Sequence, residues 1–167
     1  MVHDGEQRFS RRAHRALERA ANEARRLRGV MVEPEHLLLA ILRDDHAAGA
    51  LLVATRGNLA NGRLDLGRVI ARLEHVDEAL ATEPASAPAA STRLRSAFDC
   101  AAGEAAALND QRLSTGHLLL GVIDEAGAAA DLLASFGVEG DHVRAALAQI
   151  HPYDEDEPGW LARIHPA

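Results

Sequence analysis

The stretch "EPEHLLLAIL" at residues 33–42 returns as "STGHLLLGVI" at residues 114–123, a shift of 81 positions. The same shift aligns residues 10–54 with residues 91–135, where the identical positions fall in blocks rather than singly. Self-similarity at a fixed spacing is the signature of an internal repeat. The sequence therefore predicts two copies of one structural unit.

Each copy has the hydrophobic pattern of amphipathic helices. Between Phe9 and Leu27, apolar residues recur at intervals of three and four, which places them on one helix face. Ser10 fits an N-cap, and Pro34 fits the first position of the next helix, where its missing N–H would have no partner. We expect four helices per copy, at about residues 9–27, 34–42, 47–55 and 64–80, and then 92–108, 115–125, 128–135 and 141–150.

The composition favours a helical interior. Of the 167 residues, 47% are hydrophobic but only 3% are aromatic. Small and aliphatic side chains suit close-packed helices better than β-sandwiches. We therefore expect an all-α protein of about eight helices, arranged as two pseudo-symmetric four-helix repeats that bury each other's apolar faces.

Changes in composition along the chain predict its organisation. We expect one double-repeat domain over residues 1–150, with repeat one at 8–81 and repeat two at 92–150. Residues 82–91 are rich in Pro, Ala and Ser, which is typical of an exposed linker. Residues 151–167 include four consecutive acids and favour a mobile, solvated tail, although a docking peptide that folds on a partner is the alternative.

The charge pattern excludes several classes of function. The net charge is −7 and the chain has no lysine, so it has neither a P-loop nor a Schiff-base nucleophile. An acidic chain is repelled by nucleic-acid phosphates, and no apolar run is long enough to span a membrane. We therefore expect a protein that binds neither nucleic acid nor membranes. Because no signal segment opens the sequence, we also expect it to be cytoplasmic.

The residues suited to catalysis or metal binding form no recognisable constellation. His36 and His117 repeat, but each begins an apolar helix face, which is typical of a core or capping histidine. The sequence has no H-E-x-x-H motif and no G-x-S-x-G elbow. Its single cysteine, Cys100, lies on an Ala-rich helix face without a nominated base. We therefore expect no catalytic residues, no metal and no cofactor.

Three motifs carry a resemblance to a known family. They are F-[ST]-x-R-A at Phe9–Ala13, E-A-x-x-L at Glu23–Leu27, and E-H-[LI]-L-L at Glu35–Leu39. Over residues 8–150 the sequence resembles the N-terminal domain of Clp-family AAA+ unfoldases, especially the ClpC type. The resemblance implies an all-α pseudo-repeat that receives substrates and adaptors, while separate ATPase modules, absent from this sequence, perform the unfolding.

The resemblance also implies a ligand. ClpC-type domains bind phosphorylated arginine through a glutamate just before the His of each repeat, a position held here by Glu35 and, in the second copy, by Gly116. A carboxylate can hold a guanidinium bidentately while helix N-terminal N–H groups bind phosphate oxygens. The alternative is that Glu33 and Glu35 only cap the helix and complement its dipole.

A groove for adaptors and cyclic-peptide antibiotics is implied as well. Phe9 matches an aromatic residue that lines this groove in the family, whereas the second copy has Ala90 near the corresponding place. The candidate ligand- or peptide-binding residues are Phe9, Arg12, Glu33, Glu35, His36, Thr115 and His117.

Two functions remain open at this point. The first is a non-enzymatic protein-binding or peptide-binding domain that recruits substrates or adaptors of a Clp-type protease. The alternative is a decoy of an unfoldase N-domain that sequesters peptide antibiotics or phosphoarginine-marked proteins. The two differ in the ligand that each would bind.

Overall fold

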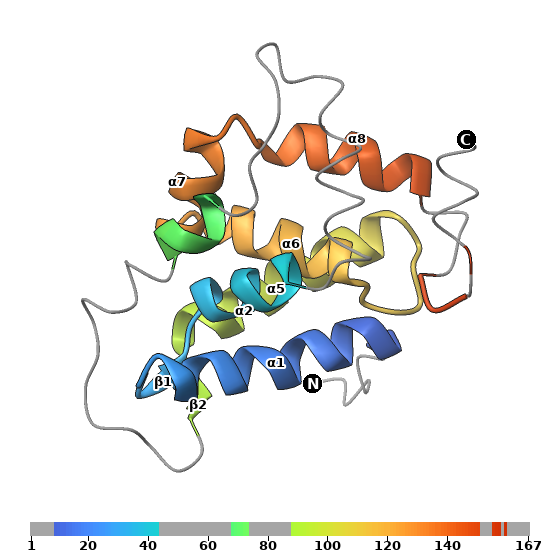
Figure 1. Cartoon of the computed structure of the whole chain (residues 1–167). Helices are drawn as coiled ribbons and strands as arrows, with labels where there is room; N and C mark the ends of the chain where they lie inside the picture. The colour runs from blue at the N-terminus through green and yellow to red at the C-terminus, as the bar shows by residue number, and fades with distance from the viewer. Residues whose placement is uncertain (1–8, 44–67, 74–87, 151–154, 158, 160–167) are drawn as a thin grey trace.

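The computed structural model describes residues 9–43, 68–73, 88–150, 155–157 and 159 (Figure 1). Its helices are α1 (Arg11–Arg26), α2 (Pro34–Leu42), α5 (Thr92–Ala107), α6 (Thr115–Asp124), α7 (Ala128–Ser135) and α8 (Gly140–Ile150). Residues 68–73 are also helical. The predicted all-α class is confirmed, and these six helices begin and end within two residues of their predicted bounds. The helix predicted at 47–55 lies outside the described residues, as does most of the one predicted at 64–80.

Two short strands, which the sequence analysis did not predict, join the repeats. Strand β1 (Met31–Val32) pairs in parallel with β2 (Ala89–Ala90), which lies in the segment predicted as an exposed linker. An isolated parallel bridge joins Phe9 to Leu113. Because Phe9 and Leu113 lie 81 positions from Ala90 and Val32, this bridge is the second copy of the β1–β2 pairing. The chain entering the first helix of each repeat therefore pairs with the other repeat, as a pseudo-twofold arrangement requires.

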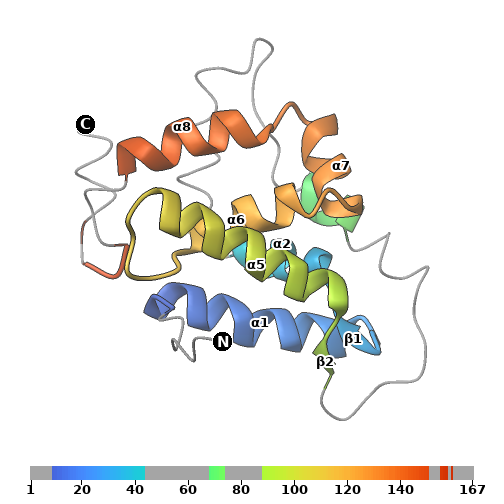
Figure 2. The ribbon, with the colours of Figure 1, turned by 180° about the vertical axis from the view of Figure 1, so that it is seen from behind.

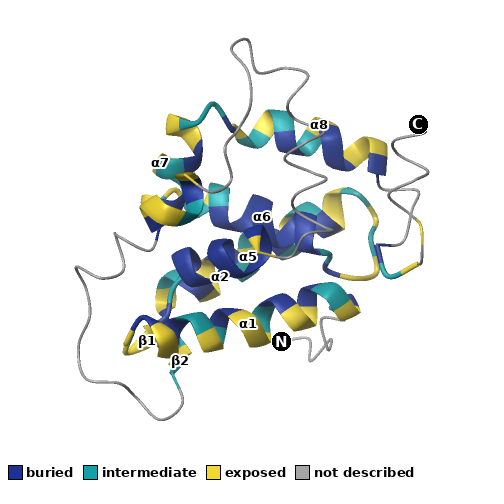
Figure 3. Ribbon diagram, in the orientation of Figure 1, coloured by how far each residue is buried: buried dark blue, intermediate teal, exposed yellow. Residues whose placement is uncertain are grey.

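The core is centred on α2 and α6. Every residue of α2 is buried, as are Thr115–Val122 of α6 (Figure 3). Figures 1 and 2 show these helices in the middle of the molecule, with α1 along one side and α8 along the opposite side. Helices that are apolar all round must be covered on every face, which explains their central position.

The outer helices α1 and α5 approach the central pair through small side chains. In α1 the buried residues are all alanine, and in α5 they are one leucine and three alanines. Small side chains allow helix axes to come close while still filling the space between them. The buried positions are Ala13, Ala16, Ala20 and Ala24 in α1, and Leu94, Ala97, Ala101 and Ala105 in α5.

The ends of α1 and α5 have the same geometry. Arg28 has a φ of 59° and Asn109 a φ of 57°, and the next residue of each closes the helix by donating to a carbonyl five residues earlier. The Gly29 N–H lies 2.8 Å from the Ala24 oxygen. This is the Schellman closure, in which a left-handed residue ends the helix.

Within the described ranges, no helix combines the length and apolar character that crossing a membrane requires. The same residues contain no group of three or more His, Cys, Asp or Glu side chains placed to hold a metal ion.

Candidate functional site

The pseudo-twofold arrangement creates two related places where the starts of two helices meet. At the α1–α6 junction, the start of α1 lies beside the start of α6, because the Ser10 N–H donates to the Leu113 oxygen at 2.9 Å. At the α5–α2 junction, the Ser91 N–H donates to the Val32 oxygen at 3.0 Å. The predicted N-cap at Ser10 is confirmed, since its Oγ accepts from the Ala13 N–H at 3.0 Å. Each junction therefore gathers helix N-terminal N–H groups from both repeats.

An ion-paired cluster fills the α5–α2 junction. The Ser91 Oγ donates to Glu33 Oε2 at 2.8 Å. The guanidinium of Arg93 donates to Glu35 Oε1 at 2.9 Å and, through Nε, to Glu125 Oε1 at 2.9 Å. Hydrogen bonds to Glu125 and then Glu35 raise the pKa of Arg93 above its ordinary value, although burial acts in the opposite direction. The cluster joins α2, α5 and the end of α6 through a charged guanidinium.

Glu35 already holds a guanidinium. Its side chain is 5% exposed, and Arg93 contacts both of its carboxylate oxygens, at 2.9 and 3.5 Å. Arg93 therefore fills the place that the family resemblance gives to an arginine of the ligand.

At the α1–α6 junction, the corresponding carboxylates come from the C-terminal segment. Glu155 is buried, and it accepts hydrogen bonds from the Ser10 hydroxyl, from the Thr115 N–H at 3.1 Å and from Thr115 Oγ1 at 2.7 Å. Asp156 accepts from the N–H groups of Arg11 at 2.8 Å and Arg12 at 3.2 Å. The two adjacent carboxylates thus bind the starts of both helices.

The prediction of a solvated tail is wrong for Glu155 and Asp156. Helix starts carry N–H groups without intrahelical partners and a positive dipole end, so they attract carboxylates. Arg12 adds a third link, because its Nε donates to the Glu155 carbonyl oxygen at 2.6 Å. Sequence reasoning identified the charge run, but nothing in the local pattern gave its docking place 145 residues away at Ser10.

The two junctions differ in where their carboxylates originate. Ser114 and Gly116 of the second copy stand where the first copy has Glu33 and Glu35. Glu155 accepts from the Ser10 hydroxyl as Glu33 accepts from the Ser91 hydroxyl. A Cβ on Gly116 would lie 2.7 Å from a methyl carbon of Leu147 in α8, so a side chain at this position would require the Leu147 side chain to move.

The structure gives His36 and His117 a capping role. Both are buried, with exposed fractions of 2% and 1%. The Nδ1 of His36 accepts from the Glu33 N–H at 2.9 Å, and the Nδ1 of His117 accepts from the Ser114 N–H at 3.0 Å. Burial lowers the pKa of His36. The interpretation as core and capping histidines is confirmed, and their burial does not support direct contact with a ligand.

Phe9 lies half-buried at the edge of the core. Its ring packs edge-on against Phe98 of α5, with 6.4 Å between centroids. Sequence reasoning missed Phe98, which stands where the first copy has Leu17. The ring contact joins the repeats, so Phe9 contributes to packing between them.

The thiol of Cys100 has the character predicted for a packed residue. It is half-buried, and burial, followed by the negative charges of Asp124 and Asp99, raises its pKa. A raised pKa leaves less of the reactive thiolate at neutral pH.

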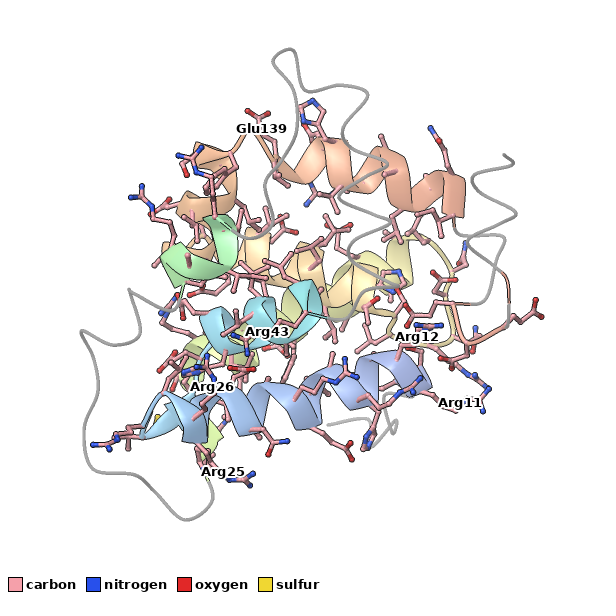
Figure 4. The ribbon with its side chains drawn as sticks, in the orientation of Figure 1. Arg11, Arg12, Arg25, Arg26, Arg43 and Glu139 are labelled. Atoms are coloured by element: carbon pink, nitrogen blue, oxygen red, sulfur yellow. The ribbon has the colours of Figure 1, made fainter. Side chains whose placement is uncertain are left out.

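A cationic hollow lies beside the α1–α6 junction. It has a volume of about 570 Å³ and is lined by Arg11, Arg12, His14, Arg15, Glu18 and Asp156. In Figure 4, Arg11 and Arg12 project at the start of α1, whereas Glu139 lies at the far end of the molecule. The hollow offers several positively charged groups next to the docked Asp156.

The fold and the paired helix starts define a double-repeat helical domain with two related junctions. The chain matches the family described as the Clp repeat (R) N-terminal domain over residues 8–136 and 89–157. It belongs to this family.

Relatives of known function align along most of the chain. It is 26% identical over 157 residues to the chaperone protein ClpB of Oceanobacillus iheyensis, which covers 93% of this chain and 18% of that protein. It is 28% identical over 146 residues to the chloroplastic chaperone protein ClpC1 of Oryza sativa subsp. japonica, which covers 86% and 15%. The chain therefore spans less than a fifth of the length of these relatives.

Solved structures share the fold. The N-terminal domain of Hsp104 from Candida albicans has a TM-score of 0.72 at 15% identity, covering 90% of this chain and 96% of that one. The ClpV N-domain in complex with a VipB peptide has a TM-score of 0.64 at 19% identity, covering 84% and 85%. At these identities the likeness establishes the helical architecture.

Proposed function

We propose that this chain is a non-enzymatic receptor for peptide segments, which recruits substrates or adaptors in regulated proteolysis by a Clp-type protease. Membership of the Clp N-terminal domain family supports this, as does a fold shared with a ClpV N-domain that binds a VipB peptide. We place this activity in the cytoplasm.

One observation carries the proposal. A segment of the chain's own polypeptide, at Glu155 and Asp156, is held at the α1–α6 junction through both side-chain and backbone groups. Three of the candidate binding residues lie at this junction or beside it, namely Phe9, Arg12 and Thr115. The helix starts therefore hold polypeptide in an arrangement that a segment of another protein can also use.

Selection from a displayed library of random linear peptides tests the proposed function. The immobilised chain should enrich a subset of sequences, and the enriched peptides should bind in solution with saturable fluorescence anisotropy. The chain denatured in urea serves as the control. Failure to enrich any linear peptide would contradict the proposal, and enrichment only from a cyclic-peptide library would favour the antibiotic-sequestering alternative.

The finer hypothesis is that phosphoarginine binds at Glu35. The contact between Arg93 and Glu35 favours it, because it demonstrates that this carboxylate accepts a guanidinium from the direction of the α5 start. A labelled phosphoarginine peptide should bind more tightly to Arg93→Ala, which vacates Glu35, and should lose binding in the double variant Arg93→Ala/Glu35→Gln. The matching unphosphorylated peptide is the control. Absence of binding by both the parent chain and Arg93→Ala would contradict the hypothesis.

A further inference from the structure

The α1–α6 junction presents a set of donors matched to two adjacent carboxylates. Ser10 and Thr115 supply two hydroxyls and one backbone N–H to Glu155. Arg11 and Arg12 supply two backbone N–H groups to Asp156. The donors come from the starts of a 16-residue helix and a 10-residue helix, whose dipoles both favour negative charge. The donors therefore contact two adjacent carboxylates rather than a single charge.

Positive side chains surround the second carboxylate. Arg11 Nε lies 3.8 Å from Asp156 Oδ2, and Arg112 lies 3.9 Å from the same oxygen. The side chains of Arg11 and Arg112 are 81% and 55% exposed. The hollow next to them is also lined by Arg15, His14 and Glu18. Exposed positive charges of this kind speed the approach of an acidic segment and orient it.

The two carboxylates, Glu155 and Asp156, lie outside the helices that they contact. At the α5–α2 junction the serine hydroxyl bonds to Glu33, the residue that begins α2 itself. At the α1–α6 junction the equivalent bond goes to Glu155, which follows α8 in the chain and lies in neither of the two helices that it contacts. A separate segment therefore occupies this junction as a ligand held within the same molecule.

We propose that the α1–α6 junction is a receptor for acidic peptide segments that carry adjacent Glu and Asp residues, and that the chain's own Glu155 and Asp156 occupy it until such a segment of a partner protein replaces them. The inference rests on the proposed function and names the ligand of one of its sites. A segment attached close to its site has an effective concentration in the millimolar range. The partner's segment therefore competes with an internal occupant.

Vacating the junction tests the proposal. In Glu155→Ala/Asp156→Ala the donors remain while both carboxylates are removed. A fluorescein-labelled peptide of residues 153–160, YDEDEPGW, should bind this variant saturably and bind the parent chain at least about tenfold more weakly. The same peptide with Ala in place of both Glu155 and Asp156 should not bind the variant, because it lacks the acceptors that Ser10, Thr115 and the Arg11 and Arg12 N–H groups contact.

A matched variant controls for net charge. Glu139→Ala/Asp141→Ala also removes two carboxylates, and Figure 4 shows Glu139 far from Arg11. It should bind the labelled peptide as weakly as the parent does. Equal binding by the two double variants, or no binding by a folded Glu155→Ala/Asp156→Ala chain, would overturn the proposal. Peptides enriched from the random library would still bind the chain in that case, so failure here is distinct from failure of the proposed function.

A second design covers loss of folding in the vacated variant. A protease site inserted between Ile150 and Glu155 allows the segment to be cut after the parent sequence has folded. Excess unlabelled YDEDEPGW should then release the cut segment, as measured by size-exclusion chromatography, whereas the peptide with Ala at both positions should not. Release by both peptides to the same extent, or by neither, would contradict recognition of the Glu-Asp pair.

Discussion

Gly121 of α6 packs directly against the backbone carbonyl of Ala97 in α5. A Cβ on Gly121 would overlap that oxygen and lie 2.9 Å from the Cβ of Ala101. We predict that Gly121→Ala lowers the free energy of unfolding by about 1–3 kcal/mol, because overpacking forces α5 and α6 apart and this outweighs the gain in helix propensity. Urea denaturation followed by circular dichroism measures the change.

Gly103 provides the matched control on α5. It also lies inside a helix, but a Cβ there would have no atom within 4 Å. Gly103→Ala should therefore raise stability by about 1 kcal/mol, the ordinary difference in helix propensity. Opposite signs for the two substitutions are expected, and a stabilising Gly121→Ala would contradict the close contact between α5 and α6.

The internal repeat explains why most of the described helices could be predicted from the sequence. Local signals such as Ser10 as an N-cap and Pro34 at a helix start depend on neighbouring residues, and Ser91 repeats the N-cap in the second copy. The strand pairing of Ala89–Ala90 was not predicted, since two-residue strands have no periodicity to detect. Candidate residues were placed at both junctions, but their partners depend on contacts between distant segments. Neither Arg93 on Glu35 nor Glu155 on Ser10 could be derived from spacing along the chain.

The arginine at the α5–α2 junction should be important for stability. Arg93→Ala leaves the buried carboxylate of Glu35 and the half-buried carboxylate of Glu125 without their guanidinium, and we predict a loss of about 1–3 kcal/mol in the free energy of unfolding. The partial exposure of Arg93 keeps the loss below that of a fully buried pair. Arg95→Ala, an exposed position on the same helix, should change stability by less than about 0.5 kcal/mol. Similar unfolding midpoints for both variants in urea would refute the assignment.

Arg28 ends α1 in a conformation that glycine adopts more readily. Its φ of 59° places the Cβ too close to the backbone, which costs about 1–2 kcal/mol. A glycine removes this cost, but its more flexible unfolded chain lowers the stability by about 0.5–1 kcal/mol. We predict that Arg28→Gly stabilises the protein by about 0.5–1 kcal/mol. Asn109→Gly, at the same place in the second repeat, should gain less because Asn tolerates this region. Differential scanning calorimetry should rank the two variants, and an equal or larger gain for Asn109→Gly would contradict the argument.

The docked Glu155 should make stability depend on pH. Burial raises its pKa above the ordinary value, although hydrogen bonds from Ser10 and Thr115 act in the opposite direction. The docked state therefore binds a proton more tightly than the unfolded chain does. The contribution of Glu155 to stability is fully present below its unfolded pKa, about 4.3, and is lost as the pH rises through the raised value.

Glu155→Gln tests the sign of this dependence, because glutamine has nearly the same shape and no titrating proton. The other charged groups facing the carboxylate pair are Arg11, Arg12 and Arg112, and all are kept in the variant. The free energy of unfolding of Glu155→Gln minus that of the parent, measured in urea at pH 4 to 8, should increase as the pH rises. Glu139→Gln, which changes the same charge at the far end of the molecule, should show no comparable trend. A difference between Glu155→Gln and the parent that stays constant or reverses with pH would show that burial does not govern the protonation of Glu155.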